Sequence, residues 1–182
     1  MKAIINGKIV TPTNILEDCV LVIKDNIIET IINKNEFNQN DFKTIIDAKS
    51  RYIMPGFIDT HSDKIEQIIQ PRPTSIMDFE IALKEVERQL INQGITTMYH
   101  SISLFKDDYF GVSHLRHKEN VLKLSELINN IHKRNHLIHH RFHLRIEIDN
   151  LDAFDVAYNM ILEKKVHQIS FMDHTPGQGQ YR

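Results

Sequence analysis

The chain has 182 residues, of which 41% are apolar and 25% charged, which is ordinary for a globular protein and excludes a chain that is disordered by composition. Its 22 basic and 24 acidic residues leave a formal net charge of -2, so composition gives no reason to expect nucleic acid or an anionic membrane as partner. The single cysteine, Cys19, excludes an internal disulfide, and no window approaches the roughly 18 apolar residues that span a bilayer. Because residues 1–8 lack the apolar core of a signal peptide, we expect a cytoplasmic protein.

Residues 1–53 alternate short β-branched runs with turn residues. The runs are separated by turn signals such as Asn6-Gly7 and Asp25-Asn26. Dipeptides of this kind between apolar runs are typical of β-hairpins. We therefore expect residues 1–53 to form a small β unit.

After Pro55, strand-like segments alternate with amphipathic helical patterns. We expect strands at 56–60, 95–101, 141–148 and 167–172 and helices between them, the first of which is capped by Asp78 and stopped by Gly94. This alternation predicts βα units and a parallel sheet. Because a closed (β/α)8 barrel typically takes about 250 residues, the segment after residue 53 fits either an open, doubly wound sheet or the first half of a larger barrel.

The expected strands all end in side chains that can bind a metal ion. His61 and Asp63 are two residues apart after the first strand, so both side chains can point to one face and bind one divalent cation. The alternative is that Asp63 caps the next element. The other candidates at the strand ends are His100, Ser101, Ser103, Glu147, Asp149, Asp173 and His174.

Glu147 and His174 each have two interpretations. Across the sheet from His61, Glu147 could bridge two cations and help to lower the pKa of a shared water molecule. Alternatively, it forms a salt bridge with Arg145 or Arg141. His174 could line the same site, or it could be a turn residue before Pro176.

A second group of candidates is basic and consists of Arg72, Arg141 and Arg145. Arginine side chains suit the bidentate capture of phosphate oxygens. In the segment 139–148, polar and apolar residues alternate, so the polar ones share one face. A barrel interior of this kind is costly unless ligands or partners satisfy it, which favours a functional face. The alternative is an exposed edge strand with its charged face in water.

The segment Met54-Pro-Gly-Phe-Ile-Asp-Thr-His61, preceded by a small β unit, resembles the amidohydrolase superfamily. The chain further resembles the phosphonate-metabolism diphosphatases of the C-P lyase pathway, a likeness that covers residues 1–182. The motifs that carry it are His61-Ser-Asp63, Pro71-Arg-Pro73, Gly94-Ile-Thr-Thr97, His143-Leu-Arg-Ile-Glu147 and Phe171-Met-Asp-His-Thr-Pro-Gly-Gln178. The resemblance implies that residues 1–53 belong to a β-sandwich-like flanking domain. It also implies that residues 54–182 form about four βα units, the first half of a metal-dependent (β/α)8 barrel.

The resemblance implies a reaction as well. Metal-activated hydroxide would attack the α-phosphorus of ribose 1-methylphosphonate 5-triphosphate, and pyrophosphate would leave. The cofactor would be a divalent metal, Zn or Mn, in a binuclear centre of the complete protein. Carried over by motif, His61 and Asp63 would bind the first metal, Glu147 would bridge, and Asp173 and His174 would line the site. Arg72, Arg141 and Arg145 would bind the triphosphate.

The chain departs from the family pattern at two points. The superfamily usually has His-x-His where this chain has His61-Ser-Asp63, a substitution that the subfamily shares. Family members are much longer, and their later strands supply two further metal histidines and an aspartate that acts as general base. A general base is therefore expected beyond residue 182. A second hypothesis follows: a truncated or split-gene fragment, inactive alone, that assembles with a missing C-terminal half or with itself.

Overall fold

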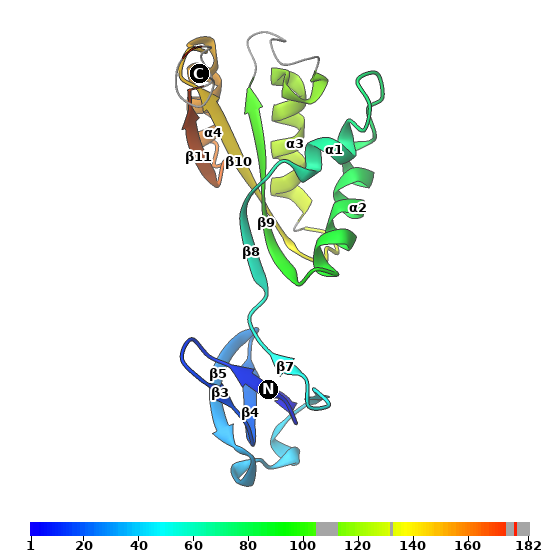
Figure 1. Ribbon diagram of the computed structural model, residues 1–182, viewed down its shortest axis with the longest axis vertical. Coiled ribbons are helices and arrows are strands. Elements are labelled where there is room, and N and C mark those ends of the chain that lie inside the picture. The colour runs from blue at the N-terminus through cyan, green and yellow to red at the C-terminus, as the bar shows by residue number, and fades with distance from the viewer. Residues whose placement is uncertain (105–112, 132, 174–176, 178–182) are drawn as a thin grey trace. The chain divides into compact units, whose positions relative to one another are not determined.

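The computed structural model describes residues 1–104, 113–131, 133–173 and 177 (Figure 1). The chain divides into two compact units, Met1–Pro55 and Gly56–Arg182. The division lies two residues beyond the expected end of the small β unit at residue 53 and coincides with the change of pattern after Pro55. Within the described part of the chain, none of the helices has the length and apolar character needed to cross a membrane.

The first unit contains short strands in two sheets, one with the order β5-β4-β1-β6 and one with the order β3-β2-β7. The hairpin predicted at Asp25-Asn26 joins β4 and β5, and both turn residues adopt positive φ, at 48° and 66°. The bounds are β1 (Lys2–Ile5), β2 (Lys8–Val10), β3 (Ile15–Leu16), β4 (Cys19–Lys24), β5 (Ile27–Asn33), η1 (Lys34–Glu36), η2 (Gln39–Asp41), β6 (Thr44–Asp47) and β7 (Tyr52–Ile53).

The Asn6-Gly7 turn does not close a hairpin, which corrects the sequence-based interpretation. β1 pairs with β4 and β6, whereas β2 pairs with β3 and β7, so this turn carries the chain from one sheet to the other. A side chain at Gly7 would collide with Ile53, and this close approach explains the glycine. The core of this unit is small and contains Ala3, Val20 and Val22.

In the second unit, the described residues form a curled parallel sheet with the strand order β11-β10-β9-β8 (Figure 1). A helical segment lies between each strand and the next along the chain, as expected for βα units. The bounds are β8 (Phe57–Ser62), α1 (Lys64–Ile69), α2 (Phe79–Ile91), β9 (Ile95–Leu104), η3 (His114–Arg116), α3 (Lys118–Ile131), β10 (His139–Glu147), α4 (Asp152–Leu162) and β11 (Gln168–Met172).

The helices pack on one face of this sheet and bury the apolar half of the alternation in its two central strands, β9 and β10. Phe142, Leu144 and Ile146 of β10 lie in the core with the apolar residues of α2, α3 and α4. Full burial of one such side chain contributes about 1.5–3 kcal/mol, so this layer is the main source of stability in the unit. The polar residues of this alternation lie on the opposite face of the sheet.

The structure confirms the predicted strands and helices of the second unit, with shifted bounds. β9 continues to Leu104, because Ile102 and Leu104 extend the buried alternation beyond the predicted end at residue 101. Ser101 and Ser103 therefore lie within the strand and not after it. The short helix α1 was not predicted. Among the described residues no helix follows β11, so three βα units are complete in that part of the chain.

Candidate functional site

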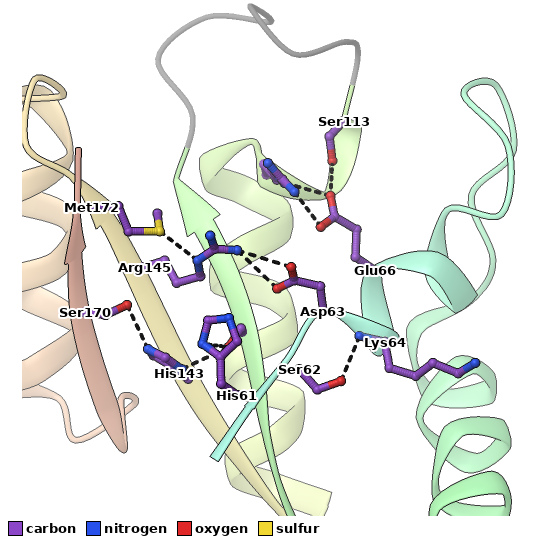
Figure 2. A network of polar contacts seen from close by, with 12 residues as sticks. His61, Ser62, Asp63, Lys64, Glu66, Ser113, His143, Arg145, Ser170 and Met172 are labelled. Carbon is purple, nitrogen blue, oxygen red and sulfur yellow. Dashed lines mark hydrogen bonds and ion pairs between the residues drawn. The ribbon is translucent and has the colours of Figure 1, made fainter. Parts of the chain in front are cut away.

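Polar side chains gather on the sheet face opposite α2, α3 and α4. Period 2 places His143 and Arg145 of β10 on this face, because Phe142, Leu144 and Ile146 point into the helix-covered core. Partners from the other strands and from the start of α1 meet them there (Figure 2). We call this set the polar-face cluster, and it consists of His61, Asp63, Ser101, His143, Arg145 and Ser170.

A chain of hydrogen bonds runs through the polar-face cluster from β8 to β11. Oγ of Ser101 lies 3.2 Å from Nδ1 of His61 and 2.9 Å from Nδ1 of His143. Nε2 of His143 lies 2.9 Å from Oγ of Ser170. The two imidazole rings meet edge to face, with centroids 5.1 Å apart. One connected network therefore includes side chains of all four strands.

The pKa of His143 is lowered from its ordinary value. The largest cause is burial, which disfavours the charged imidazolium, and the neighbouring His61 lowers the pKa further. A backbone hydrogen bond with Thr60 acts in the opposite direction, as does the Asp63 carboxylate, while Arg145 adds to the lowering. The imidazole of His143 is therefore neutral at pH 7.

Asp63 and Arg145 form an ion pair at the end of the cluster. Nη1 of Arg145 lies 3.2 Å from Oδ1 and 3.3 Å from Oδ2 of Asp63, and Nε donates to Sδ of Met172 at 2.8 Å (Figure 2). Asp63 occupies the N-cap position of α1, but its side chain accepts no capping hydrogen bond. The alternative in which the Asp63 carboxylate caps the next element is therefore not what the structure shows. Instead, the carboxylate faces the guanidinium.

A second polar contact fixes α1 to the segment before α3. Glu66 accepts two hydrogen bonds from Arg116, from Nε at 2.7 Å and from Nη2 at 2.9 Å, and a third from the Ser113 hydroxyl at 2.6 Å (Figure 2). The two charged side chains are 16% and 22% exposed, so water screens this pair only in part. Sequence reasoning missed this contact, because its partners lie 50 residues apart and no local pattern relates them.

His100 does not join the polar-face cluster, although it was expected to line the site. It lies on the helix-covered side of β9, where Nε2 is 2.8 Å from Nδ1 of His140. Nε2 of His140 is in turn 3.4 Å from a carboxylate oxygen of Glu87 on α2. Burial and the neighbouring His140 hold the pKa of His100 well below its usual range. The reason for the difference is the alternation of β9, which sends His100 and Ser101 to opposite faces.

The other predicted site residues have different positions. Arg141 lies two residues before His143 in β10, and Glu147 is the last residue of that strand, in register with Met172. Arg72 is exposed on the loop between α1 and α2 and is not part of the cluster. Asp173 follows β11, and His174 lies outside the described residues.

The residues expected to bind a metal do not form a complete ligand set. Among the described residues, no group of three or more His, Cys, Asp or Glu side chains is placed to hold a metal ion. His61 and Asp63 both lie in the polar-face cluster, but the Asp63 carboxylate is engaged by Arg145. The described part of the site therefore does not fit a closed metal centre.

Comparison with known proteins supports the resemblance found in the motifs. The chain is similar to a sugar-triphosphate diphosphatase. It is 27% identical over 145 residues to alpha-D-ribose 1-methylphosphonate 5-triphosphate diphosphatase of Escherichia coli (strain K12), a match that covers 79% of this chain and 37% of that protein. No protein-family model matches the chain. The motif-based resemblance is thereby confirmed, and the chain spans well under half of its relative's length.

A solved structure shows the same fold. N-acetylglucosamine-6-phosphate deacetylase from Pasteurella multocida superposes with a TM-score of 0.61 at 13% identity, over 93% of this chain and 44% of that protein. At this identity the likeness concerns the fold alone. Together with the curled parallel sheet, it supports a mixed α/β fold in which the second unit is part of a parallel barrel.

Proposed function

We propose that the chain contributes to the active site of a hydrolase that cleaves a sugar 5-triphosphate. The observation that carries the proposal is the 27% identity over 145 residues to a protein named as such a diphosphatase. By that likeness, the substrate would be ribose 1-methylphosphonate 5-triphosphate. Water would add to the α-phosphorus, the bond to the α–β bridging oxygen would break, and pyrophosphate would leave the sugar 5-phosphate.

The arginines of β10 are the proposed ligands of the triphosphate. Arg141 and Arg145 share one face of the strand, because they alternate with Phe142 and Leu144, which are buried on the other side. A guanidinium offers several donors in a plane that matches phosphate oxygens. Arg72 remains a prediction, since it is exposed on the loop between α1 and α2 and takes no part in the cluster's hydrogen bonds.

We propose that His143 fixes the orientation of its neighbours in the polar-face cluster and does not act as the general base. Both of its ring nitrogens are engaged, Nδ1 with Ser101 and Nε2 with Ser170. A ring with both nitrogens held by hydroxyl groups is well fixed in orientation, but it has no free nitrogen to exchange a proton with water. The general base is expected from a later strand of the complete protein, as the family resemblance implies.

A divalent metal, Zn or Mn, is part of this proposal through the resemblance. Since the described residues lack a three-ligand group, we derive no catalytic step through the metal. His61, Asp63 and Glu147 remain the proposed ligands, to be completed by side chains outside the described residues. Nothing in the comparisons favours the alternative of a truncated or split-gene fragment that is inactive alone.

The test is product analysis by ³¹P NMR. Ribose 1-methylphosphonate 5-triphosphate is incubated with Mn²⁺ and this chain, alone and mixed with a separately produced segment that completes the length of the diphosphatase relative. We expect the mixture to release pyrophosphate together with the sugar 5-phosphate. The Arg141→Gln variant should raise KM about tenfold, because one charged phosphate contact is lost.

One control substrate and two contradicting outcomes make this assay specific. N-acetylglucosamine 6-phosphate tests whether the shared fold brings the deacetylase's activity with it, and we expect no acetate to be released. Release of orthophosphate in place of pyrophosphate would contradict the assigned bond cleavage. Absence of any product from the triphosphate in both preparations would contradict the proposed function itself.

A further inference from the structure

A polar cavity lies in the first unit, and the proposed reaction does not involve it. Its volume is about 360 Å³, within the range of about 300–1,000 Å³ that is typical of small-molecule sites. The lining comes from four segments: residues 6–8 between β1 and β2, residues 17–19 at the start of β4, Lys34 after β5, and residues 47, 49 and 50 at the end of β6. All of these residues belong to Met1–Pro55, so one compact unit forms the cavity.

Backbone hydrogen bonds hold the rim of the cavity in place. The N–H of Lys34 donates to the carbonyl of Asp18 at 2.9 Å, and the N–H of Ser50 donates to the carbonyl of Asn6 at 2.7 Å. Four residues of the rim also adopt the left-handed conformation, which is uncommon outside glycine and is often found at ligand-binding sites. They are Asn6, Asp18, Lys49 and Ser50, with φ between 51° and 61°.

The carboxylates around the cavity differ in their partners. Glu17 is paired with Lys8, whose Nζ lies 2.9 Å from Oε1. Oδ1 of Asp47 accepts from the N–H of Lys49 at 2.9 Å, and this bond is the largest cause of the lowered pKa of Asp47. By contrast, the Asp18 carboxylate accepts no hydrogen bond among the described residues. Asp18 is therefore the carboxylate that can accept from a ligand.

Two ammonium groups at the cavity also lack a direct partner. Among the described residues, the side chains of Lys34 and Lys49 make no hydrogen bond or ion pair. Both positive charges contribute to the lowered pKa of Asp47, so both act within electrostatic range of the same wall of the cavity. An anion with more than one negative charge can therefore interact with both lysines at once.

We propose that this cavity binds a small phosphorylated sugar, with its phosphate at Lys34 and Lys49 and a hydroxyl group at the Asp18 carboxylate. Lysine binds phosphate as a point charge, and two such charges suit a dianion. An ionised carboxylate only accepts hydrogen bonds, so Asp18 repels a bare phosphate but accepts from the hydroxyl of a sugar. The ligand class is therefore a sugar phosphate and not phosphate alone.

The test is a titration of the ¹⁵N-labelled chain, followed by NMR, with ribose 5-phosphate as the probe. Ribose and inorganic phosphate are titrated separately, because each carries only one half of the proposed chemistry. We expect ribose 5-phosphate to shift amide signals of the four lining segments and to bind about tenfold more tightly than inorganic phosphate, because a hydrogen bond to a charged group is added. Since the lysines are exposed, the affinity should fall as the salt concentration rises.

Variants of the lining residues assign the contacts. Lys34→Gln and Lys49→Gln should each weaken ribose 5-phosphate binding about tenfold, because one charged phosphate contact is lost. Lys24→Gln is the matched control, since Lys24 is an exposed lysine of the same unit that does not line the cavity. Asp18→Asn should weaken ribose 5-phosphate binding but not phosphate binding. The amide spectrum of each variant shows whether it is folded.

Three outcomes would overturn this assignment. Shifts spread over the whole chain, or the same loss in Lys24→Gln as in Lys34→Gln, would indicate binding to surface charge in general. Inorganic phosphate that binds as tightly as ribose 5-phosphate would remove the role of the sugar. Tighter binding of both probes to Asp18→Asn would show that Asp18 only repels. Since no readout involves triphosphate turnover, this proposal and the proposed function can each fail alone.

Discussion

His100 is buried with its Nδ1 atom unpaired among the described residues, between the sheet and α2. The hydrogen bonds next to it fix how its proton is placed. A carboxylate oxygen of Glu87 accepts from Nε2 of His140, so Nδ1 of His140 is the acceptor for Nε2–H of His100. Nδ1 of His100 is then left as a lone pair without a donor. Such a ring is stable only when neutral, in agreement with the direction of its pKa.

This arrangement predicts acid sensitivity. The unfolded chain takes up a proton on residue 100 near the ordinary pKa of about 6.5, whereas the folded chain does not until a lower pH. Between those two pKa values the unfolded state binds more protons, so stability falls as the pH falls below about 6.5, by about 1.4 kcal/mol per pH unit for each such proton. Above that pH this group contributes no pH dependence.

Denaturant unfolding between pH 5 and pH 8 measures the effect. His100→Phe retains an aromatic ring in the buried layer but cannot titrate, so its stability should depend less on pH below 6.5 than that of the unmodified chain. His117→Gln is the comparison variant, because it removes an exposed imidazole and leaves the buried layer intact. The same acid dependence in His100→Phe as in the unmodified chain would rule out His100 as the cause.

At the scale of single elements, α2 shows how far the sequence predicts the fold. Asp78 was expected to cap this helix, and its carboxylate accepts hydrogen bonds from the N–H groups of Glu80 and Ile81, each at 3.0 Å. A cap of this kind contributes about 1 kcal/mol, because it satisfies donors that the first turn leaves without partners. The cap involves only residues that are close together in the sequence, so the spacing of residues along the sequence is enough to predict it.

Replacement of this cap gives a direct test. Asp78→Ala should lower the free energy of unfolding by about 0.5–2 kcal/mol and reduce the midpoint of urea denaturation. Asp78→Asn is the control, because an asparagine side-chain oxygen caps helices about as well as aspartate does. If both variants lose the same stability, the carboxylate charge and not the capping oxygen would be responsible.

The candidate site was predicted less completely than the elements that carry it. Alternation along β10 placed Arg145 and Glu147 on one face, and the motif at the end of β8 brought His61 and Asp63 to the same region. One interpretation paired Glu147 with Arg145 or Arg141, but the structure pairs Arg145 with Asp63, 82 residues away. The spacing of residues along the sequence cannot predict the Arg145–Asp63 pair, because this contact depends on strand order and on the register shift between β8 and β9. For the same reason, no local sequence pattern predicts the Glu66–Arg116 contact.

At the scale of the molecule, the second unit presents uncovered strand edges and apolar side chains. In the described part of the chain, β8 and β11 each have one neighbour in the sheet, so their outer edges are unpaired. Apolar residues of β11 and of α4 are exposed, among them Phe171 at 65% and Tyr158 at 62%, and the rings of Phe154 and Phe171 stack with centroids 6.5 Å apart. Open edges and contiguous apolar surface are typical sites of association. The exposed apolar side chains of β11, of α4 and of the segment between β10 and α4 are Ile148, Leu151, Phe154, Tyr158, Ile161, Leu162, Ile169 and Phe171.

We propose that the edge of β11 binds a polypeptide equivalent to the remaining length of the diphosphatase relative, of which this chain spans 37%. Pairing would satisfy the backbone groups of β11 and bury the apolar surface beside it, so the separately produced segment should form a 1:1 complex and raise the melting temperature. Size-exclusion chromatography with light scattering measures the mass. Phe171→Asp should weaken the complex, whereas Ile15→Asp, which changes an exposed apolar residue of the first unit, should not. A stable dimer of the chain alone, disrupted by Phe171→Asp, would instead identify a second copy as the occupant of this edge.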